Sequence, residues 1–291
     1  MSSAPRRAEA LAKVNRELRV GPRRSDGFHE IRSRFVTVDL SDSLEVREGA
    51  AWEFSCAGGP EDDSNLAARA AAALAKAAGI PRRGALSLEK RIPAGAGLGG
   101  GSADAAVALG MLARLWDVSM PADRLTAIAA SIGSDVPYFL SGGEADVGGR
   151  GERVVPREDS PARIITILIP PFSISTADVY EAFDRIGGSA APPERLEIES
   201  TGRFLGRNDL ERAVVDVRPE MRDYLEEGRT VAAECGVTGS GSAILLVGAS
   251  AEAVADLIMR HPGTRALPAR TVSRDEYRRR AGFPDGPAPR A

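Results

Sequence analysis

The chain has 291 residues, of which 43% are hydrophobic, 27% charged and 5% aromatic, and its formal net charge is −3 at pH 7. This composition excludes a disordered chain, a fibrous protein and a disulfide-stapled miniprotein, because a chain of this length buries enough surface to fold without cross-links. The near-neutral charge argues against a dedicated nucleic-acid binder, which usually carries a strong basic excess.

The first half of the chain is expected to begin with strands and to continue with helices rich in small residues. Asn65 is a suitable N-cap for an alanine-rich helix ending at Gly79, because alanine loses almost no side-chain entropy in a helix. Turns are expected at Gly21-Pro22 and at Ser41-Asp42-Ser43. The other expected elements are strands over 11–20, 35–40, 44–46 and 85–88, a helix from Ser102 or Ala103, a helix from Pro121 to Gly133, and a hairpin over 144–155.

The second half follows a charged, turn-rich segment at 157–161. We take this segment as a boundary between an N-terminal domain over 1–158 and a C-terminal domain over 159–291. Because no steady βαβ alternation is present, two α+β domains fit better than a doubly wound sheet. The expected elements are strands over 164–169, 242–247 and 266–272, helices over 176–186, 209–227 and 251–260, and a frayed tail over 282–291.

A glycine-rich segment, PAGAGLGGGSADAA from Pro93 to Ala106, is the strongest local signal. Its five glycines allow backbone N–H groups to point into one concavity without interference from Cβ atoms. The helix that follows adds unpaired N–H groups and the positive end of its dipole. This combination favours an anion such as a nucleotide phosphate, and the hydroxyl of Ser102 could touch the phosphate or a metal ion.

Three other interpretations of this loop are weaker. A Walker-type P-loop requires a lysine before its final Ser or Thr, and that lysine is absent. Gly95, Gly97 and Gly100 satisfy a bare GxGxxG, which keeps a dinucleotide-dependent oxidoreductase open, although the preceding strand is short and half polar. A flexible linker would rarely lead directly into a strong helix. The loop alone therefore indicates phosphate binding and little more.

Three segments taken together are more specific. Ala12-Lys13-Val14-Asn15, the glycine-rich segment and Thr238-Gly239-Ser240-Gly241-Ser242 resemble the three motifs of the GHMP kinases, a superfamily of small-molecule kinases. The segments Arg24–Glu30 and Gly133–Pro137 are similar to one branch of it. That branch uses ATP to phosphorylate the 2-hydroxyl of a substrate carrying a cytidine diphosphate group, in non-mevalonate isoprenoid precursor biosynthesis. Another GHMP small-molecule kinase is the alternative.

The resemblance implies both a fold and a set of roles. The fold is a two-domain GHMP kinase fold of the α+β class, with an N-terminal ribosomal-protein-like α/β domain and a C-terminal ferredoxin-like domain. Lys13 and Asp135 match the catalytic pair. The positions implied for ATP are Asn65, Lys90, Pro93, Ala94, Gly95, Ala96, Gly97, Leu98, Gly99, Gly100, Gly101, Ser102 and Ala103, and those implied for the acceptor substrate are Asn15, Phe28, His29, Thr238, Gly239 and Ser240.

The chemistry of these residues is compatible with the implied roles. A carboxylate such as Asp135 can take the proton of an alcohol during phosphoryl transfer, although an Asx turn is the structural alternative. The ammonium of Lys13 could steady a γ-phosphate if it faces the cleft, whereas most strand lysines are solvated edge charges. Phe28 could stack on a pyrimidine while His29 hydrogen-bonds its edge.

The sequence also bears on metals, compartment and partners. No cluster of carboxylates in the sequence has the pattern of a full set of metal ligands, so Mg²⁺ is expected to arrive with ATP. Ser102 and Asp104 are candidate contacts for the ion. The two cysteines lack metal-site spacing, and no signal peptide or stretch long enough to cross a bilayer is recognisable. These features predict a cytoplasmic protein that binds neither nucleic acid nor membrane, and no signal specifies its oligomeric state.

The chain departs from the family pattern in its first motif. Arg16-Glu17 stand where apolar residues usually follow, which concerns the edge of the substrate pocket or the register of its strand. A nucleotide-binding protein that has lost catalysis through this change is a further alternative. The phosphate loop itself is unaffected.

Overall fold

The computed structural model describes residues 6–189 and 196–283. In this part of the chain the strands are β1 (Arg6–Arg23), β2 (His29–Arg47), β3 (Trp52–Ala57), β4 (Gly84–Glu89), β5 (Glu144–Gly149), β6 (Arg153–Pro156), β7 (Ile164–Ile169), β8 (Glu234–Val237), β9 (Ile244–Val247) and β10 (Arg265–Val272). The helices are α1 (Leu66–Ala78), α2 (Gly100–Leu115), α3 (Ala122–Ile132), α4 (Thr176–Arg185), α5 (Ile198–Thr201), α6 (Glu211–Val217), α7 (Met221–Val231), α8 (Ala251–Arg260) and α9 (Arg274–Arg280).

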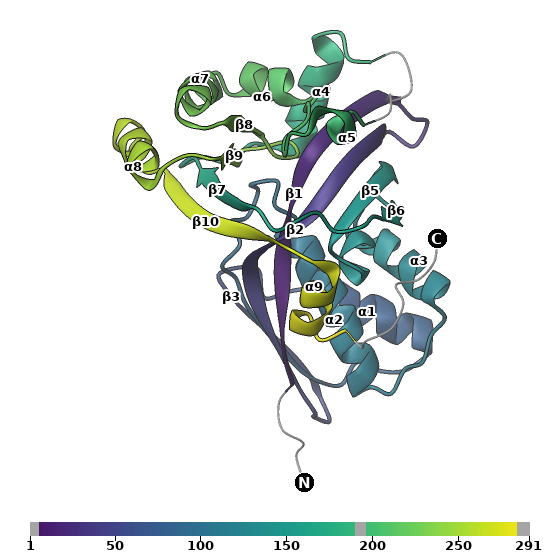
Figure 1. The fold of residues 1–291 in the computed structure, drawn as a ribbon. Helices are drawn as coiled ribbons and strands as arrows, with labels where there is room; N and C mark the ends of the chain where they lie inside the picture. The colour runs from purple at the N-terminus through teal and green to yellow at the C-terminus, as the bar shows by residue number, and fades with distance from the viewer. Residues whose placement is uncertain (1–5, 190–195, 284–291) are drawn as a thin grey trace.

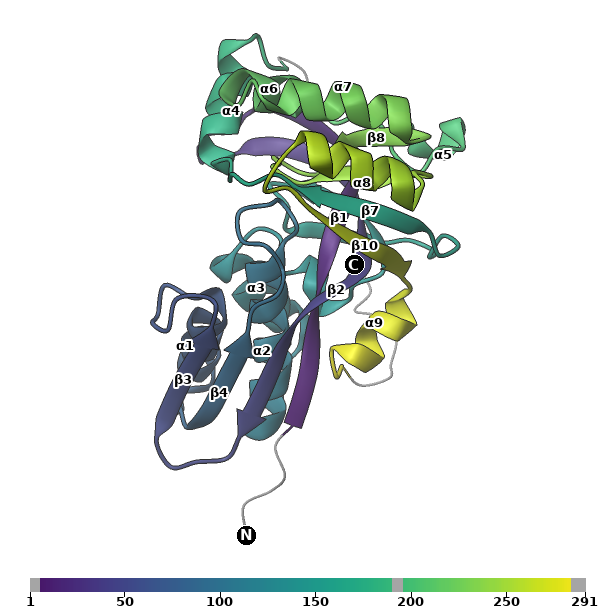
Figure 2. The same ribbon diagram turned by 90° about the vertical axis from the view of Figure 1, so that its left-hand side faces the viewer.

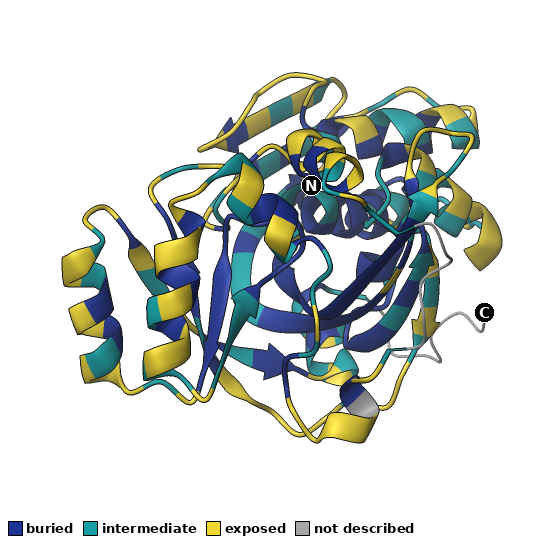
Figure 3. Cartoon of the chain, turned by 90° about the horizontal axis from the view of Figure 1, so that it is seen from above, coloured by how far each residue is buried: buried dark blue, intermediate teal, exposed yellow. Residues whose placement is uncertain are grey.

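A ten-stranded mixed sheet connects the two halves of the chain. Its main path has the order β3-β4-β2-β10-β7-β9-β8, with β1 and β5 also paired to β2, and β6 paired to β5. Figure 1 shows the helices in two groups, with α1 to α3 and α9 around the lower part and α4 to α8 around the upper part. The long strands β1 and β2 run through both parts, and Figure 3 shows that the strands at the centre are largely buried.

The two longest strands correct the predicted turns. The Gly21-Pro22 turn is wrong because β1 continues to Arg23, and the Ser41-Asp42-Ser43 turn is wrong because β2 is continuous. Breaks in the β1–β2 register, for example between Asn15 and Glu17, let the pair follow a curved path without ending. Asp42 is fully buried, and its carboxylate accepts the backbone N–H of Ile92 at 2.8 Å. The polar side chain that suggested a turn at Asp42 therefore makes a tertiary contact instead.

Local capping signals are confirmed. The Asn65 side chain accepts the N–H of Ala67 at 3.0 Å, and Gly79 ends the helix with φ 68°. The third helix, the hairpin, the strand over 85–88, and the elements near 164–169, 176–186, 251–260 and 266–272 are also present. The helix after the glycine loop begins at Gly100, two or three residues before the expected start at Ser102 or Ala103.

Other elements differ from prediction. The helix expected over 209–227 is interrupted before Met221, since Pro219 supplies no N–H for the preceding turn. The strands β3 and β8 and the helix α9 carry no clear periodic pattern and were not predicted. The expected frayed tail lies mostly outside the described residues.

The C-terminal end of the described chain returns to the first half. β10 pairs with both β7 and β2, and α9 then packs beside β1 (Figure 2). The buried hydroxyl of Tyr277 donates to the carbonyl of Phe139, and Arg280 Nε lies 2.6 Å from Glu9 Oε2. The division of the chain between residues 158 and 159 stays a prediction.

Candidate active site

A cavity of about 520 Å³ is lined by residues from both halves of the chain. The predicted site residues in its wall are Lys13, Asn15, Phe28, His29, Gly97, Gly99, Ser102, Asp135, Gly239 and Ser240. The predicted residues that do not line it are Asn65, Lys90, Pro93, Ala94, Gly95, Ala96, Leu98, Gly100, Gly101, Ala103 and Thr238. Sequence segments separated by more than two hundred residues therefore meet around one space.

The predicted catalytic pair lies together in this wall. Lys13 Nζ is 3.6 Å from Asp135 Oδ2 and donates to Asn15 Oδ1 at 2.7 Å. The Lys13 side chain is 5% exposed and that of Asp135 is 29% exposed, so the lysine is not a solvated edge charge. Burial lowers the pKa of the Lys13 ammonium, and the Asp135 carboxylate opposes this shift. The pair combines a buried cation with a more accessible carboxylate.

The glycine loop packs tightly against other motifs. Gly95, Gly97 and Gly99 have φ between 68° and 78°, the left-handed region that glycine adopts without strain. A Cβ at Gly97 would lie 2.7 Å from the carbonyl oxygen of Thr238, and one at Gly99 would lie 2.9 Å from the ring of Phe139. Gly97 and Gly99 are thus required for two reasons: neighbouring protein atoms leave no room for a Cβ, and the backbone is in the left-handed region.

Backbone hydrogen bonds fix the loop beside the Lys13–Asp135 pair. The N–H of Lys13 donates to the carbonyl of Leu98 at 3.0 Å, and the N–H of Ala243 donates to the carbonyl of Ala96 at 3.2 Å. The helix α2 starts directly after this loop, with no side-chain cap and no acidic residue in its first turn. Its first N–H groups and its dipole are therefore suited to an anion.

The third motif is joined to the first by side chains. The N–H of Asn15 donates to Thr238 Oγ1 at 2.8 Å, while Asn15 Nδ2 donates to Ser33 Oγ at the same distance. Ser240 Oγ lies 2.8 Å from Thr176 Oγ1 at the start of α4. Thr238 is buried behind the wall and positions Asn15, whereas Gly239 and Ser240 reach the cavity.

An aromatic group forms another part of the wall. The imidazole of His29 stacks on the ring of Tyr180 at 5.1 Å, and Phe28 is 47% exposed. His29 Nδ1 lies 2.9 Å from the carbonyl oxygen of Gly21, which can only accept, so Nδ1 carries a proton. His29 Nε2 lies 3.4 Å from Asp184 Oδ1. Sequence reasoning missed Tyr180, because a tyrosine on an amphipathic helix resembles a core residue.

Asn65 and Lys90 have structural partners in the described chain. Asn65 caps α1 and donates to the carbonyl of Pro60 at 3.0 Å. Lys90 is paired with Asp42 and, at 2.5 Å, with Asp104. Burial raises the pKa of Asp104 to about 7, although Lys90 opposes this shift, and Asp104 Oδ1 has no hydrogen-bond partner among the described residues.

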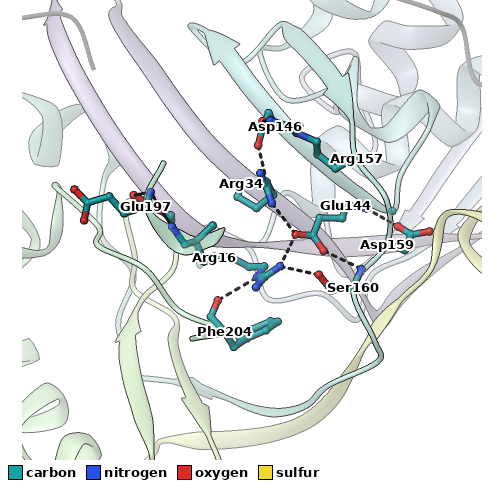
Figure 4. Close-up of polar contacts among 12 residues, drawn as sticks. Arg16, Arg34, Glu144, Asp146, Arg157, Asp159, Ser160, Glu197 and Phe204 are labelled. Carbon is teal, nitrogen blue, oxygen red and sulfur yellow. Dashed lines mark hydrogen bonds and ion pairs between the residues drawn. The ribbon is translucent and has the colours of Figure 1, made fainter. Parts of the chain in front are cut away.

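The unusual Arg16-Glu17 pair is accommodated away from the cavity. Arg16 pairs with Glu144 and donates from Nε to the carbonyl of Phe204 at 3.0 Å (Figure 4). The Glu17 carboxylate accepts the N–H of Ile198 at 2.9 Å. Neither side chain lines the cavity. The β1–β2 register breaks at Arg16, between Asn15 and Glu17, whereas Lys13 and Asn15 pair in one register with Thr37 and Phe35.

Within residues 6–189 and 196–283 no group of three or more His, Cys, Asp and Glu side chains is arranged to hold a metal ion. Over the same residues, no helix has the length and apolar character needed to span a bilayer.

Comparisons with known proteins agree with this geometry. A family model described as the GHMP kinases N terminal domain matches residues 65–143. The 4-diphosphocytidyl-2-C-methyl-D-erythritol kinase of Salinispora tropica (strain ATCC BAA-916 / DSM 44818 / JCM 13857 / NBRC 105044 / CNB-440) is 36% identical over 273 residues, covering 86% of this chain and 85% of the relative.

Solved structures give the same result. A crystal structure of 4-(cytidine 5'-diphospho)-2C-methyl-D-erythritol kinase matches with a TM-score of 0.76 and 32% identity, covering 92% of this chain and 100% of the other. A homoserine kinase from Cytophaga hutchinsonii ATCC 33406 matches with a TM-score of 0.68 at 18% identity, covering 94% of this chain and 96% of the other, which shows a shared fold alone. The chain therefore has the mixed α/β fold of the GHMP kinases and belongs to the 4-diphosphocytidyl-2-C-methyl-D-erythritol kinase family.

Proposed function

We propose that this protein transfers the γ-phosphate of ATP to the 2-hydroxyl of 4-diphosphocytidyl-2-C-methyl-D-erythritol, in non-mevalonate isoprenoid precursor biosynthesis. The observation that carries the proposal is one cavity whose wall holds the Lys13–Asp135 pair, the glycine loop and the aromatic group of Phe28, His29 and Tyr180. Phosphoryl transfer needs the first two, and a pyrimidine-bearing acceptor needs the third. The names of the similar proteins support the same reaction.

In this proposal the chain supplies position and charge. Asp135 accepts the proton of the 2-hydroxyl as the new P–O bond forms, and the Lys13 ammonium neutralises charge on the transferred group. The N–H groups of the glycine loop, of which Gly97 and Gly99 line the cavity, and of the first turn of α2 hold the phosphates of ATP. Asn15 orients the lysine, because its Oδ1 accepts from Nζ.

Magnesium belongs to the same proposal. Bound together with ATP, Mg²⁺ would supply positive charge that offsets the charge of the phosphates. Ser102, whose side chain reaches the cavity beside Gly99, is the group that would hold it. A divalent ion held mainly by ATP needs few protein ligands.

The finer architecture is also a proposal. We expect a ribosomal-protein-like N-terminal domain over 1–158 and a ferredoxin-like C-terminal domain over 159–291, with α9 returning to the first. A cytoplasmic location is likewise proposed, as for an enzyme of small soluble metabolites.

The rival oxidoreductase function is disfavoured. The glycine loop leads from β4 into α2, and in the described residues β4 pairs only with β3 and β2, which both precede the loop. A dinucleotide-binding βαβ unit instead requires the strand after the helix to lie parallel to the strand before it in the same sheet. The similar proteins are kinases. The match of Gly95, Gly97 and Gly100 to GxGxxG is therefore a coincidence that follows from the many glycines of the loop.

A coupled ADP-release assay tests the proposal. We expect ADP release with 4-diphosphocytidyl-2-C-methyl-D-erythritol and none above background with mevalonate, homoserine or galactose. Faster turnover of one of those alcohols would assign the chain to another branch of the superfamily. Tight binding of ATP without turnover of any acceptor would identify a nucleotide-binding protein that has lost catalysis.

Phe28→Ala is expected to raise the KM for the acceptor by an amount equivalent to ~1–3 kcal/mol, because an aromatic platform for one base is lost. Phe28 is 47% exposed, so the truncation should leave thermal unfolding nearly unchanged. Steady-state kinetics at saturating ATP measure the effect. An unaltered KM for the acceptor would show that Phe28 is not part of the base site.

A further inference from the structure

The cavity wall contains an arginine, Arg150, that belongs to none of the sequence motifs. Arg150 lies in the turn between β5 and β6 and lines the cavity together with Phe28 and Asp135. The glycines on either side have φ of 71° and 133°, which gives the turn a defined shape. The N–H of Arg150 donates to Glu152 Oε2 at 2.8 Å. The backbone that carries this side chain is therefore held in place.

The guanidinium is also held, yet its charge is not neutralised. Arg150 Nη2 donates to the carbonyl of Ala130 at 3.1 Å, and the guanidinium carbon lies 5.0 Å from the centre of the Phe28 ring. Over residues 6–189 and 196–283 Arg150 forms no ion pair with a carboxylate. The neighbouring Asp26, which senses this charge, is itself paired with Arg24 at 3.1 Å.

Other arginines of the same hairpin differ from Arg150. Arg153 pairs with Glu30, and Arg157 pairs with Asp146. Neither of them lines the cavity. A guanidinium has five N–H donors, and within the described residues one of those of Arg150, on Nη2, donates to a protein carbonyl. The remaining donors and the charge are available to an anionic group in the cavity.

The position of Arg150 indicates which anion this is. Arg150 stacks on Phe28, in the aromatic group, while the next residue, Gly151, lies against the catalytic carboxylate, where a Cβ would be 3.0 Å from Asp135 Oδ1. The arginine thus lies on the path from the base site to the reacting hydroxyl. In the proposed acceptor, the group between the cytidine and the hydroxyl-bearing carbon chain is a diphosphate.

We propose that Arg150 binds the diphosphate of the acceptor substrate, and that it thereby determines specificity for a nucleoside diphosphate over an uncharged alcohol. Arginine suits this task because its planar fork binds phosphate oxygens through two parallel hydrogen bonds. Anchoring on Ala130 and Phe28 reduces the side-chain entropy lost on binding. This inference rests on the proposed function, since the diphosphate belongs to that substrate.

Calorimetric titration of cytidine and CDP into the wild-type protein, Arg150→Gln and Arg150→Lys tests the inference. The wild type is expected to bind CDP more tightly than cytidine. Arg150→Gln should weaken CDP binding about 10- to 100-fold, the usual loss for a charge-assisted hydrogen bond, and should leave the affinities for cytidine and, in a separate titration, for ATP unchanged. Arg150→Lys keeps the charge without the fork and should give an intermediate loss.

Arg153→Gln is the matched control, because it removes an arginine of the same hairpin outside the cavity, and it should bind CDP like the wild type. A folded Arg150→Gln or Arg150→Lys protein that keeps the full preference for CDP would overturn the assignment. An equal loss of cytidine and CDP binding would also overturn it, since Arg150 would then only support Phe28. These results concern Arg150 alone, whereas a wild type that releases no ADP with the acceptor would refute the proposed function itself.

Discussion

Asp135→Asn is expected to lower kcat at least ~10²-fold while leaving the KM for ATP nearly unchanged, because the variant keeps the shape of the side chain but loses its proton acceptor. The glycine loop that would hold ATP contacts the site through backbone groups, which the substitution does not alter. The Lys13 pKa, already lowered by burial, would fall further without the carboxylate 3.6 Å away. Loss of the base and loss of cationic charge on Lys13 therefore act in the same direction.

Steady-state kinetics with varied ATP and varied acceptor measure this effect. Asp178→Asn is the matched control, since Asp178 is an exposed carboxylate in the first turn of α4 and does not line the cavity. It should turn over like the wild type. Wild-type turnover by Asp135→Asn would remove Asp135 from the reaction and leave it as a turn-stabilising residue.

Lys90→Met is expected to destabilise the protein by ~3–5 kcal/mol, because it leaves two buried carboxylates without their shared cation. Asp42 is fully buried, Asp104 is 1% exposed, and both are paired with Lys90. The resemblance to GHMP kinases implies a role for Lys90 near ATP, whereas these contacts assign it a structural one. Equilibrium unfolding in urea separates the two, since a residue that only binds nucleotide would change the KM for ATP and little else.

The loss of stability should depend on pH. The pKa of Asp104 is raised by burial to about 7 from an ordinary 3.8, so between these values the folded state binds more protons than the unfolded state and stability falls as the pH rises. Without Lys90, which lowers this pKa, the shift becomes larger. The free energy of unfolding that Lys90→Met loses relative to the wild type should therefore be greater at pH 8 than at pH 5.

Arg7→Met provides the comparison for this experiment. Arg7 pairs with Glu45, but its side chain is 78% exposed, so its removal should change stability by less than ~1 kcal/mol. An Arg7→Met protein as unstable as Lys90→Met, or a Lys90→Met protein as stable as the wild type, would contradict the structural role of the buried triad.

The sequence was most informative where the physical signal is local. Asn65 and Gly79 delimit α1 because capping depends on a few adjacent residues. The glycine loop predicts an anion site from the sequence alone, because the relevant N–H groups lie in the backbone of one segment. The prediction for Lys13 and Asp135 depends on the resemblance rather than on any local pattern, since a strand lysine and a turn aspartate are common by themselves, and the structure brings the two within 3.6 Å.

Long-range contacts explain what the sequence did not show. Ser41-Asp42-Ser43 resembles a turn, but Asp42 is a buried partner for Lys90 and for the N–H of Ile92. The Arg16-Glu17 departure is balanced by Glu144 and by the N–H of Ile198, more than a hundred residues away. Tyr180 and Arg150 reach the cavity only because α4 and the β5–β6 turn are folded beside His29 and Phe28.

The most direct test of the proposed reaction is a crystal structure of the protein with a non-hydrolysable ATP analogue, Mg²⁺ and 4-diphosphocytidyl-2-C-methyl-D-erythritol. We expect the terminal phosphate at the mouth of the glycine loop, with the 2-hydroxyl about 3 Å from a carboxylate oxygen of Asp135. A triphosphate bound away from Gly97 and Gly99, or an acceptor whose 2-hydroxyl faces away from Asp135, would contradict the account.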